Sequence, residues 1–219
     1  MTEITEFITN DFKAIDKQES IATVQNFFSD LNFTHFPVVD EGIYIGSISS
    51  EDIETFDSAK KVADYRFTLE GFFTRTTMIW LDVLEVFAKN KTNLVPVLDG
   101  NNIYVGYYEI EDVMRFFYNT PFLKEPGGII VVKKPVLEYS MSQIAQIVES
   151  NNGKLLGLFV SQVEVDSVVV TLKITLGAMN EIIQTLRRYN YIIMTEHQED
   201  NYINNLKERS EYLDKYLNI

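Results

Sequence analysis

The stretch Gly46-Ser-Ile-Ser-Ser-Glu-Asp52 contains residue types that could hold a phosphorylated or polyhydroxyl ligand. Gly46 lets the backbone approach another group closely, because glycine has no side chain. A hydroxyl such as Ser49 at a helix start, beside free N–H groups, suits a phosphate, and a carboxylate one turn later, as at Asp52, suits a ribose diol. The same spacing also fits a capping box, in which the serine caps the helix and the acid answers it. Local spacing alone leaves both interpretations open.

The motif belongs to a tandem repeat of about sixty residues. Gly46–Asp52 recurs as Gly106–Asp112, and the upstream run His35–Asp40 recurs as Val95–Asp99. The second copy keeps its glycine and its final aspartate, but Glu109 stands where the hydroxyl of Ser49 would be. A carboxylate repels phosphate, and the repulsion grows as water is excluded. The two copies are therefore expected to differ in what they can bind.

Hydrophobic periodicity predicts the order helix, strand, strand, helix in each copy. The elements expected in the first are 20–32, 34–39, 43–48 and 50–57; those in the second are a helix from 80, strands 94–98 and 103–108, and a helix to about 117. From residue 129 the predicted order becomes β-α-β-β-α-β, with strands over 129–134, 154–163, 168–176 and 191–195 and helices over 140–151 and 179–189. That order is the ferredoxin-like split βαβ arrangement, and it places the chain in the mixed α/β (α+β) class.

These patterns predict a division of the chain. The tandem repeat is expected over 1–120, in halves of about 1–60 and 61–120, followed by a linker over 121–128, the ferredoxin-like domain over 129–197 and an amphipathic helix over 198–219. The first 120 residues carry 20 acidic and 9 basic side chains, against 12 and 10 in the rest. This change in charge supports a boundary near residue 120.

Composition excludes several kinds of site. The chain of 219 residues has no cysteine and two histidines, so thiolate metal sites and cysteine nucleophiles are excluded, and we expect no metal site. No nucleophile–base pair or phosphate-binding glycine loop of an NTPase is present, so no catalytic residue is assigned and an enzyme is not expected. The net charge of −13 argues against nonspecific binding to nucleic acid or to an anionic membrane. No signal sequence or spanning segment is seen, and a cytoplasmic location is expected.

Four other conspicuous side chains are expected to be structural. His35 precedes Phe36 and Pro37 on a strand edge, where packing is the commoner role for an isolated histidine. Trp80 has the helical spacing of a core residue. Tyr107 and Tyr108 could stack on a base, but neighbours on a strand point to opposite faces, and packing is the expected role for both.

Residues 1–120 resemble the tandem cystathionine-β-synthase (CBS) domain pair. The resemblance is carried by His35-Phe-Pro-Val-Val-Asp40 and Gly46–Asp52, and again by Val95-Pro-Val-Leu-Asp99 and Gly106–Asp112. It implies a compact disc whose clefts bind adenosine compounds such as AMP, ATP or S-adenosylmethionine, without a required cofactor. The hydroxyl of the motif would lie near phosphate and its aspartate would hold ribose.

The resemblance implies one competent cleft, with Pro37, Gly46, Ser49 and Asp52 as ligand-binding residues, and Asp112 as a candidate in the second copy. Because of Glu109, the second cleft is expected to be empty, to take an uncharged adenosine moiety, or to need a cation. Asp112 alone also fits a residue at a helix start.

Residues 129–196 resemble the ACT domain, a regulatory βαββαβ module that often dimerises and binds amino acids. Glu138-Tyr-Ser-Met141 places Tyr139 where that family has a ligand-contacting glycine, so we expect association rather than amino-acid sensing from this part. The CBS pair, ACT-like domain and terminal helix together resemble the acetoin-utilisation type of stand-alone CBS–ACT protein.

Two functions remain open. The first is a regulatory module that binds an adenosine-containing ligand in one CBS cleft and forms a homodimer through the ACT-like domain. The second is a scaffold with vestigial clefts that binds an unknown protein partner, which the scarcity of Lys and Arg near the motif favours, because polyphosphates need cationic partners. A CBS module that responds to a divalent cation is a variant of the first.

Overall fold

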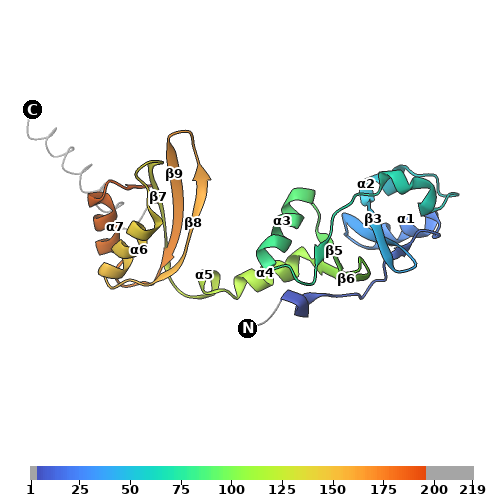
Figure 1. The fold of residues 1–219 in the computed structure, drawn as a ribbon, viewed down its shortest axis with the longest axis horizontal. Helices are drawn as coiled ribbons and strands as arrows, with labels where there is room; N and C mark the ends of the chain where they lie inside the picture. Colours follow the sequence, from blue (N-terminus) through green and yellow to red (C-terminus); the bar gives the residue numbers. More distant parts are fainter. Residues whose placement is uncertain (1–3, 196–219) are drawn as a thin grey trace, which may run out of the picture. The chain divides into compact units, whose positions relative to one another are not determined.

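The computed structural model describes residues 4–195, and the chain divides into two compact units, Met1–Asn119 and Thr120–Ile219 (Figure 1). Each unit is described by itself. The helix predicted over 198–219 lies outside the described residues. The described part contains no helix that is both long enough and apolar enough to cross a membrane.

The first unit is built from two copies of one small fold. The first copy comprises the 3-10 helix Ile4–Phe7, β1 (Ile15–Asp16), α1 (Ile21–Asp30), β2 (His35–Asp40), β3 (Ile43–Ser49) and α2 (Ser50–Thr55). The second comprises the 3-10 helix Val62–Thr68, β4 (Thr74–Arg75), α3 (Trp80–Asn90), β5 (Leu94–Leu98), β6 (Tyr104–Glu109) and α4 (Ile110–Tyr118). The predicted repeat of helix, strand, strand, helix is confirmed. The sequence did not predict β1 and β4, which at two residues each are too short to show alternation.

Each copy forms a three-stranded sheet of the same topology. The orders are β1-β2-β3 and β4-β5-β6, with a parallel first pair and an antiparallel hairpin. Both hairpins carry an irregularity at the same place, after Val38 in one and after Val97 in the other. The two copies of the sequence repeat therefore also share the same strand pairing, including the position of its irregularity.

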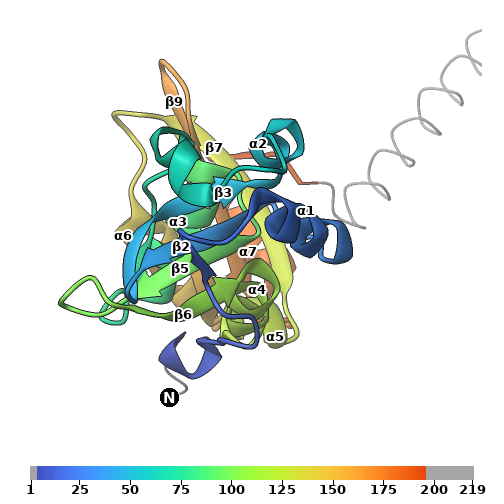
Figure 2. The same cartoon turned by 90° about the vertical axis from the view of Figure 1, so that its right-hand side faces the viewer.

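The two copies meet about an approximate two-fold axis, with β2 and β5 side by side (Figure 2). At one end, the backbone N–H of Thr34 donates to Asn93 Oδ1 at 3.0 Å, and the N–H of Asn93 donates to Thr34 Oγ1 at 3.1 Å. At the other end, Ile43 and Ile103 form an antiparallel bridge between the hairpin tips. The copies are joined by equivalent residues at both ends.

Tyr107 and Tyr108 are both fully buried, at 0% exposure. They point to opposite faces of β6 as expected, and each face is covered. Tyr107 packs in the cluster of Phe36 and Ile48 from the first copy, and Tyr108 packs with Val83 and its neighbours in the second. The packing role is confirmed, and it explains why aromatic side chains occur at consecutive positions.

The Tyr108 hydroxyl is buried with no hydrogen-bond partner among the residues that the structure describes. Burial raises the pKa of this hydroxyl to about 12. Burial removes this hydroxyl from water, and no hydrogen bond in the folded state compensates for the loss. Tyr108→Phe should therefore raise the free energy of unfolding by about 1 kcal/mol. Chemical denaturation followed by circular dichroism measures this change.

Tyr44→Phe is the matched control, since its hydroxyl donates to the Phe72 carbonyl oxygen at 2.7 Å and lies 2.9 Å from Ser47 Oγ. Its removal should lower the free energy of unfolding by about 1 kcal/mol. A loss of stability in both variants would contradict the description of Tyr108 as unpartnered.

The second unit contains α5 (Pro121–Lys124), β7 (Gly128–Pro135), α6 (Met141–Ser150), β8 (Leu155–Val163), β9 (Ser167–Ile174), α7 (Met179–Arg188) and β10 (Ile192–Ile193). From β7 on, the predicted order β-α-β-β-α-β is confirmed. The sheet order is β10-β7-β9-β8, and every neighbouring pair is antiparallel. Both helices cover one face of this sheet, where residues such as Val132, Ile144 and Ile182 form the core.

The stretch 121–128, expected as a linker, contains α5, whose first residue is Pro121. Proline is favoured at this position because its missing N–H would have had no helical partner. Phe122 lies edge-on to Phe159 of β8 at 5.7 Å and covers Gly157, where an added Cβ would lie 2.1 Å from the Phe122 ring. Contacts that are distant in sequence therefore hold this stretch on the sheet.

Candidate functional site

Ser49 and Asp52 lie together where β3 turns into α2. Ser49 is the N-cap of α2, and its hydroxyl accepts a hydrogen bond from the Asp52 N–H at 3.1 Å. The half-buried carboxylate of Asp52 has no hydrogen-bond or ion-pair partner among the described residues. Only half of a capping box is therefore present: the serine caps the helix, and the acid does not answer it. The Asp52 carboxylate, at the N-terminus of α2, can therefore accept hydrogen bonds from a ligand.

Gly46 allows another segment of the same chain, residues 69–70, to pack closely against its backbone. Its φ is +146°, and an added Cβ would lie 2.7 Å from Leu69 Cβ and 3.3 Å from the Glu70 carbonyl oxygen. Ser47 and Glu70 exchange two backbone hydrogen bonds of 2.8 Å each. The close contact that the glycine permits is made by the segment 69–70, so the structure does not require Gly46 to touch a ligand.

Pro37 lies on the same sheet face as the site. Across the hairpin, His35 pairs with Ser49 and Pro37 pairs with Ser47, so all four side chains share one face. The opposite face carries Phe36 and its neighbours into the core. Pro37 is buried. The roles predicted for Pro37, Gly46, Ser49 and Asp52 as ligand contacts stay predictions.

The expected packing role of His35 is confirmed. Its Nε2 lies 3.2 Å from Glu70 Oε1, its Nδ1 lies 3.1 Å from Thr34 Oγ1, and its ring is edge-on to Phe72 at 5.3 Å. The segment 69–72 therefore lies along this face of the hairpin. No local pattern predicts this contact, because residues 35 and 70 are far apart along the chain.

Tyr44 also holds this segment, through a hydrogen bond from its hydroxyl to the Phe72 carbonyl oxygen. Burial raises the pKa of its hydroxyl to about 12, so the group stays protonated and donates to Phe72 at all ordinary pH values. Together, Tyr44 and His35 hold the start of the second copy against the β2–β3 hairpin of the first.

The equivalent positions in the second copy are arranged differently. Glu109 is the N-cap of α4 and makes no capping hydrogen bond. Asp112 forms an ion pair with Arg115 on its own helix at 3.1 Å. Gly106 allows contact with Thr9, which exchanges backbone hydrogen bonds of 3.0 and 2.9 Å with Tyr107. The carboxylate of Asp112 is thus occupied where that of Asp52 is free, and its predicted role as a ligand contact stays a prediction.

Burial raises the pKa of the Glu109 carboxyl, and the carboxylates of Asp112, Glu111 and Asp11 raise it further. A raised pKa in the folded state means that ionising Glu109 costs stability. This cost is absent below the ordinary pKa of 4.5 and becomes complete as the pH rises through the folded-state value. Glu109→Gln should therefore be more stable than the parent at pH 7, and this difference should vanish below about pH 4.5. Thermal unfolding across this pH range, compared with the exposed control Glu54→Gln, tests the prediction.

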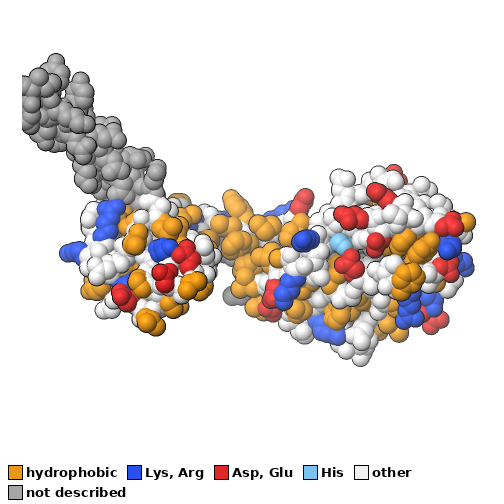
Figure 3. Space-filling model, turned by 90° about the horizontal axis from the view of Figure 1, so that it is seen from above, with side chains coloured by type: hydrophobic (Ala, Val, Ile, Leu, Met, Phe, Trp, Pro, Cys, Tyr) orange, Lys and Arg blue, Asp and Glu red, His pale blue; other side chains and the backbone are white. Residues whose placement is uncertain are grey.

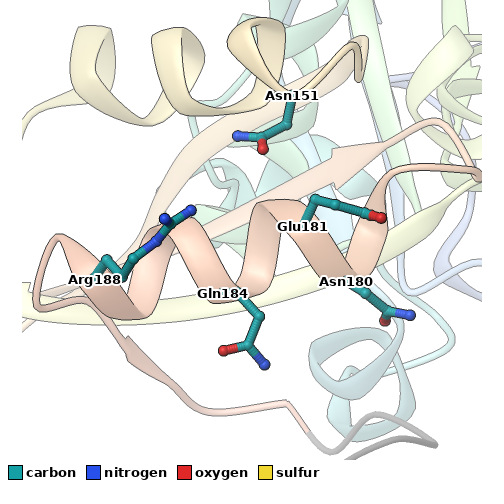
Figure 4. Close-up of a pocket in the computed structure, with 5 residues that line it drawn as sticks. All are labelled: Asn151, Asn180, Glu181, Gln184 and Arg188. Atoms are coloured by element: carbon teal, nitrogen blue, oxygen red, sulfur yellow. The ribbon is translucent and has the colours of Figure 1, made fainter.

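Two cavities are lined by other residues. One, of about 370 Å³, lies between α1 and α2 and is lined by Gln25, Phe28, Ser29, Ser50, Ile53 and Glu54. The other, of about 560 Å³, lies on α7 of the second unit. Figure 4 shows Gln184 and Asn180 pointing to the opposite side of α7 from Asn151, so its polar side chains do not converge on one ligand. Within residues 4–195, no group of three or more acidic or histidine side chains could hold a metal ion.

Residues 4–57 match the family model of the CBS domain. The second half of the first unit repeats this fold strand for strand, with the same register irregularity. The first unit thus consists of a stretch that matches the CBS domain model and a second copy of the same fold.

Three known proteins illustrate the similarity. An uncharacterised protein of Methanocaldococcus jannaschii is 25% identical over 52% of this chain and 43% of its own length. A CBS domain pair/ACT domain protein of Thermotoga maritima is 19% identical, with a TM-score of 0.48, over 53% of this chain and 96% of that one. CBSX2, solved in complex with AMP, is 18% identical, with a TM-score of 0.45, over 53% of this chain and 96% of that one. The chain thus spans less than half of its curated relative.

Proposed function

We propose that the CBS pair is a regulatory module that binds one adenosine-containing ligand, such as AMP, ATP or S-adenosylmethionine, beside Ser49 and Asp52. The observation that carries the proposal is the unpartnered, half-buried carboxylate of Asp52 at the start of α2. A carboxylate in that position can accept both hydrogen bonds of a ribose diol. The second copy offers no equivalent acceptor, because Asp112 is already paired with Arg115.

The contacts around this site suggest how binding would be transmitted. Ser49 shares a sheet face with His35 and Ser47. Both His35 and Ser47 contact Glu70, which lies in the second copy between its 3-10 helix and β4. A ligand placed on this face would favour one arrangement of the segment 69–72 over another. Regulation requires such a difference in affinity between two states, since a ligand that binds both equally shifts nothing.

Thermal unfolding of the protein with AMP, ATP and S-adenosylmethionine, each with and without Mg²⁺, tests the proposal. A ligand that binds only the folded state stabilises it by about 2.7 kcal/mol at a hundredfold excess over its Kd. We expect at least one of the three to raise the Tm. No rise in any mixture would contradict an adenosine ligand, and a rise with Mg²⁺ alone would favour the divalent-cation variant.

A scaffold with vestigial clefts is the second candidate, and two observations favour it. The Ser49 hydroxyl already caps α2, and the space beside Gly46 is filled by Leu69. A partner protein would then bind the surface of the CBS pair. The same panel separates the candidates, because a scaffold gains no stability from nucleotides.

We assign the second unit a role in association, as an ACT-like element that holds a homodimer. Tyr139 packs against the core of the second unit, at the position where a glycine would leave space for an amino-acid ligand. This supports association over amino-acid binding. A cytoplasmic location and the acetoin-utilisation type complete the proposal. Both rest on the composition and the arrangement of domains.

A further inference from the structure

Tyr107 holds the position in the second copy that Ser47 holds in the first. Each is paired across its hairpin with a proline, Pro96 in one copy and Pro37 in the other. Tyr107 lies two residues before Glu109 on β6, so the two side chains share one sheet face. A large aromatic side chain therefore stands in the second copy where the candidate site of the first copy has a small hydroxyl side chain.

The ring of Tyr107 packs against two phenylalanine rings of the first copy. Its centroid lies 6.0 Å from that of Phe33 and 5.7 Å from that of Phe36, and both contacts are edge-on. Tyr107 is fully buried in the same core cluster as Phe36. Burial raises the pKa of its hydroxyl, and the carboxylates of Glu109 and Asp11 raise it further. The side chain therefore fills the region between the β6 face and the first copy, near Glu109.

The approximate two-fold axis relates these three aromatic positions to Ser47, Thr92 and Val95. The correspondence is fixed by Thr34 and Asn93, which exchange hydrogen bonds across the axis and sit at equivalent places in the two copies. None of the three related residues is aromatic. Three rings thus meet on one side of the first unit, where the other side has only small side chains.

Leu94 adds to this difference. It pairs with the first residue before α4, as His35 pairs with the first residue before α2, and it is fully buried in the same cluster as Tyr107. The side chain of His35, in contrast, is 12% exposed. It is the one histidine among residues 1–119, and its pale-blue surface is visible on the first unit in Figure 3. The candidate site is therefore reached from solvent at His35, whereas core side chains fill its counterpart.

We infer that Tyr107 is the residue that excludes ligand from the second cleft, because its ring already occupies the space that a planar base would take. The inference rests on the adenosine site proposed above for the first copy. It assigns the choice between the two clefts to one pair of positions, Ser47 and Tyr107. The charge of Glu109 repels only phosphate, whereas the ring of Tyr107 also excludes an uncharged adenosine.

Tyr107→Ser tests this inference, because it gives the second copy the residue of the first. The Tyr104 hydroxyl is buried without a hydrogen-bond partner among the described residues, and the new hydroxyl would serve it as Ser47 Oγ, 2.9 Å away, serves Tyr44. The matched control is Tyr108→Ser, which removes an equally buried ring from the opposite face of β6. Calorimetric titration of the full-length proteins uses adenosine, which has no phosphate for Glu109 to repel.

We expect Tyr107→Ser to bind one more adenosine per chain than the parent, and Tyr108→Ser to bind the same number as the parent. No additional site in Tyr107→Ser, or an equal gain in both variants, would overturn the inference. Failure of the parent to bind any adenosine compound would instead contradict the proposed function. The two failures are distinct, because the gain is counted relative to the parent.

A second measurement does not depend on adenosine. The probe is p-cresol, which has the structure of the side chain that Tyr107→Ser removes, and small aromatic molecules bind apolar cavities of this kind. Saturating p-cresol should raise the Tm of Tyr107→Ser by at least about 4 °C, and it should not change that of Tyr107→Phe, which keeps the ring. If Tyr107→Ser is unfolded alone, p-cresol should restore its folded circular dichroism spectrum. Neither a rise in Tm nor a recovery of folding would overturn the inference.

Discussion

Replacing Asp52 by alanine is expected to weaken binding of the adenosine ligand by about 10- to 100-fold. A hydrogen bond to a charged group contributes about 1.5–3 kcal/mol, and each 1.4 kcal/mol is a factor of ten in affinity. The carboxylate of Asp52 has no partner among the described residues, so the variant loses no described contact. Its fold should therefore survive, with a loss of at most about 1 kcal/mol from the favourable interaction of an acid with a helix N-terminus.

The matched control is Asp112→Ala, at the equivalent position of the second copy. It removes an i,i+3 ion pair with Arg115, whose side chain is 63% exposed, and such a pair contributes little stability. Its affinity for the ligand should equal that of the parent. Equal losses of affinity in both variants would mean that the two clefts act alike, against the asymmetry described above.

Gly106→Ala should destabilise the first unit by about 2–3 kcal/mol, through overpacking. An added Cβ would lie 2.5 Å from the Thr9 carbonyl oxygen and 2.7 Å from Ile8 Cγ2. The first of these is a backbone atom, so relief requires the segment before the first copy to move away from β6. This movement would break its two hydrogen bonds with Tyr107.

Gly71→Ala is the control, because no atom lies within 4 Å of its added Cβ. It should change the free energy of unfolding by less than about 1 kcal/mol. Urea denaturation of both variants gives the comparison. Equal stability of the two alanine variants would show that the contact between Thr9 and Tyr107 is absent in solution.

The sequence predicted the parts of the fold that depend on local pattern. The repeat, the two hairpins and the β-α-β-β-α-β order all follow from periodicity and turn residues within short windows. It did not predict the crossed contacts, in which the segment 69–70 packs on Gly46 and the segment 8–9 packs on Gly106. These contacts join residues that are distant in sequence, and no local signal marks them.

The candidate site shows the same limit. Ser49 and Glu109 could be compared in the sequence, because both stand at a predicted helix start. The pairing of Asp112 was open to prediction, because Arg115 follows it at the i,i+3 spacing of neighbours on a helix, whereas the first copy has Thr55 at the equivalent position after Asp52. The consecutive tyrosines of β6 were expected to pack, but the sequence did not reveal that both faces of that strand are covered.

A calorimetric titration of the parent protein, using whichever adenosine ligand raises its Tm, tests the central claim most directly. The asymmetry between Asp52 and Asp112 predicts one binding site per chain, with no second heat of binding at higher ligand concentration. Two equivalent sites per chain, or no heat of binding at all, would contradict it.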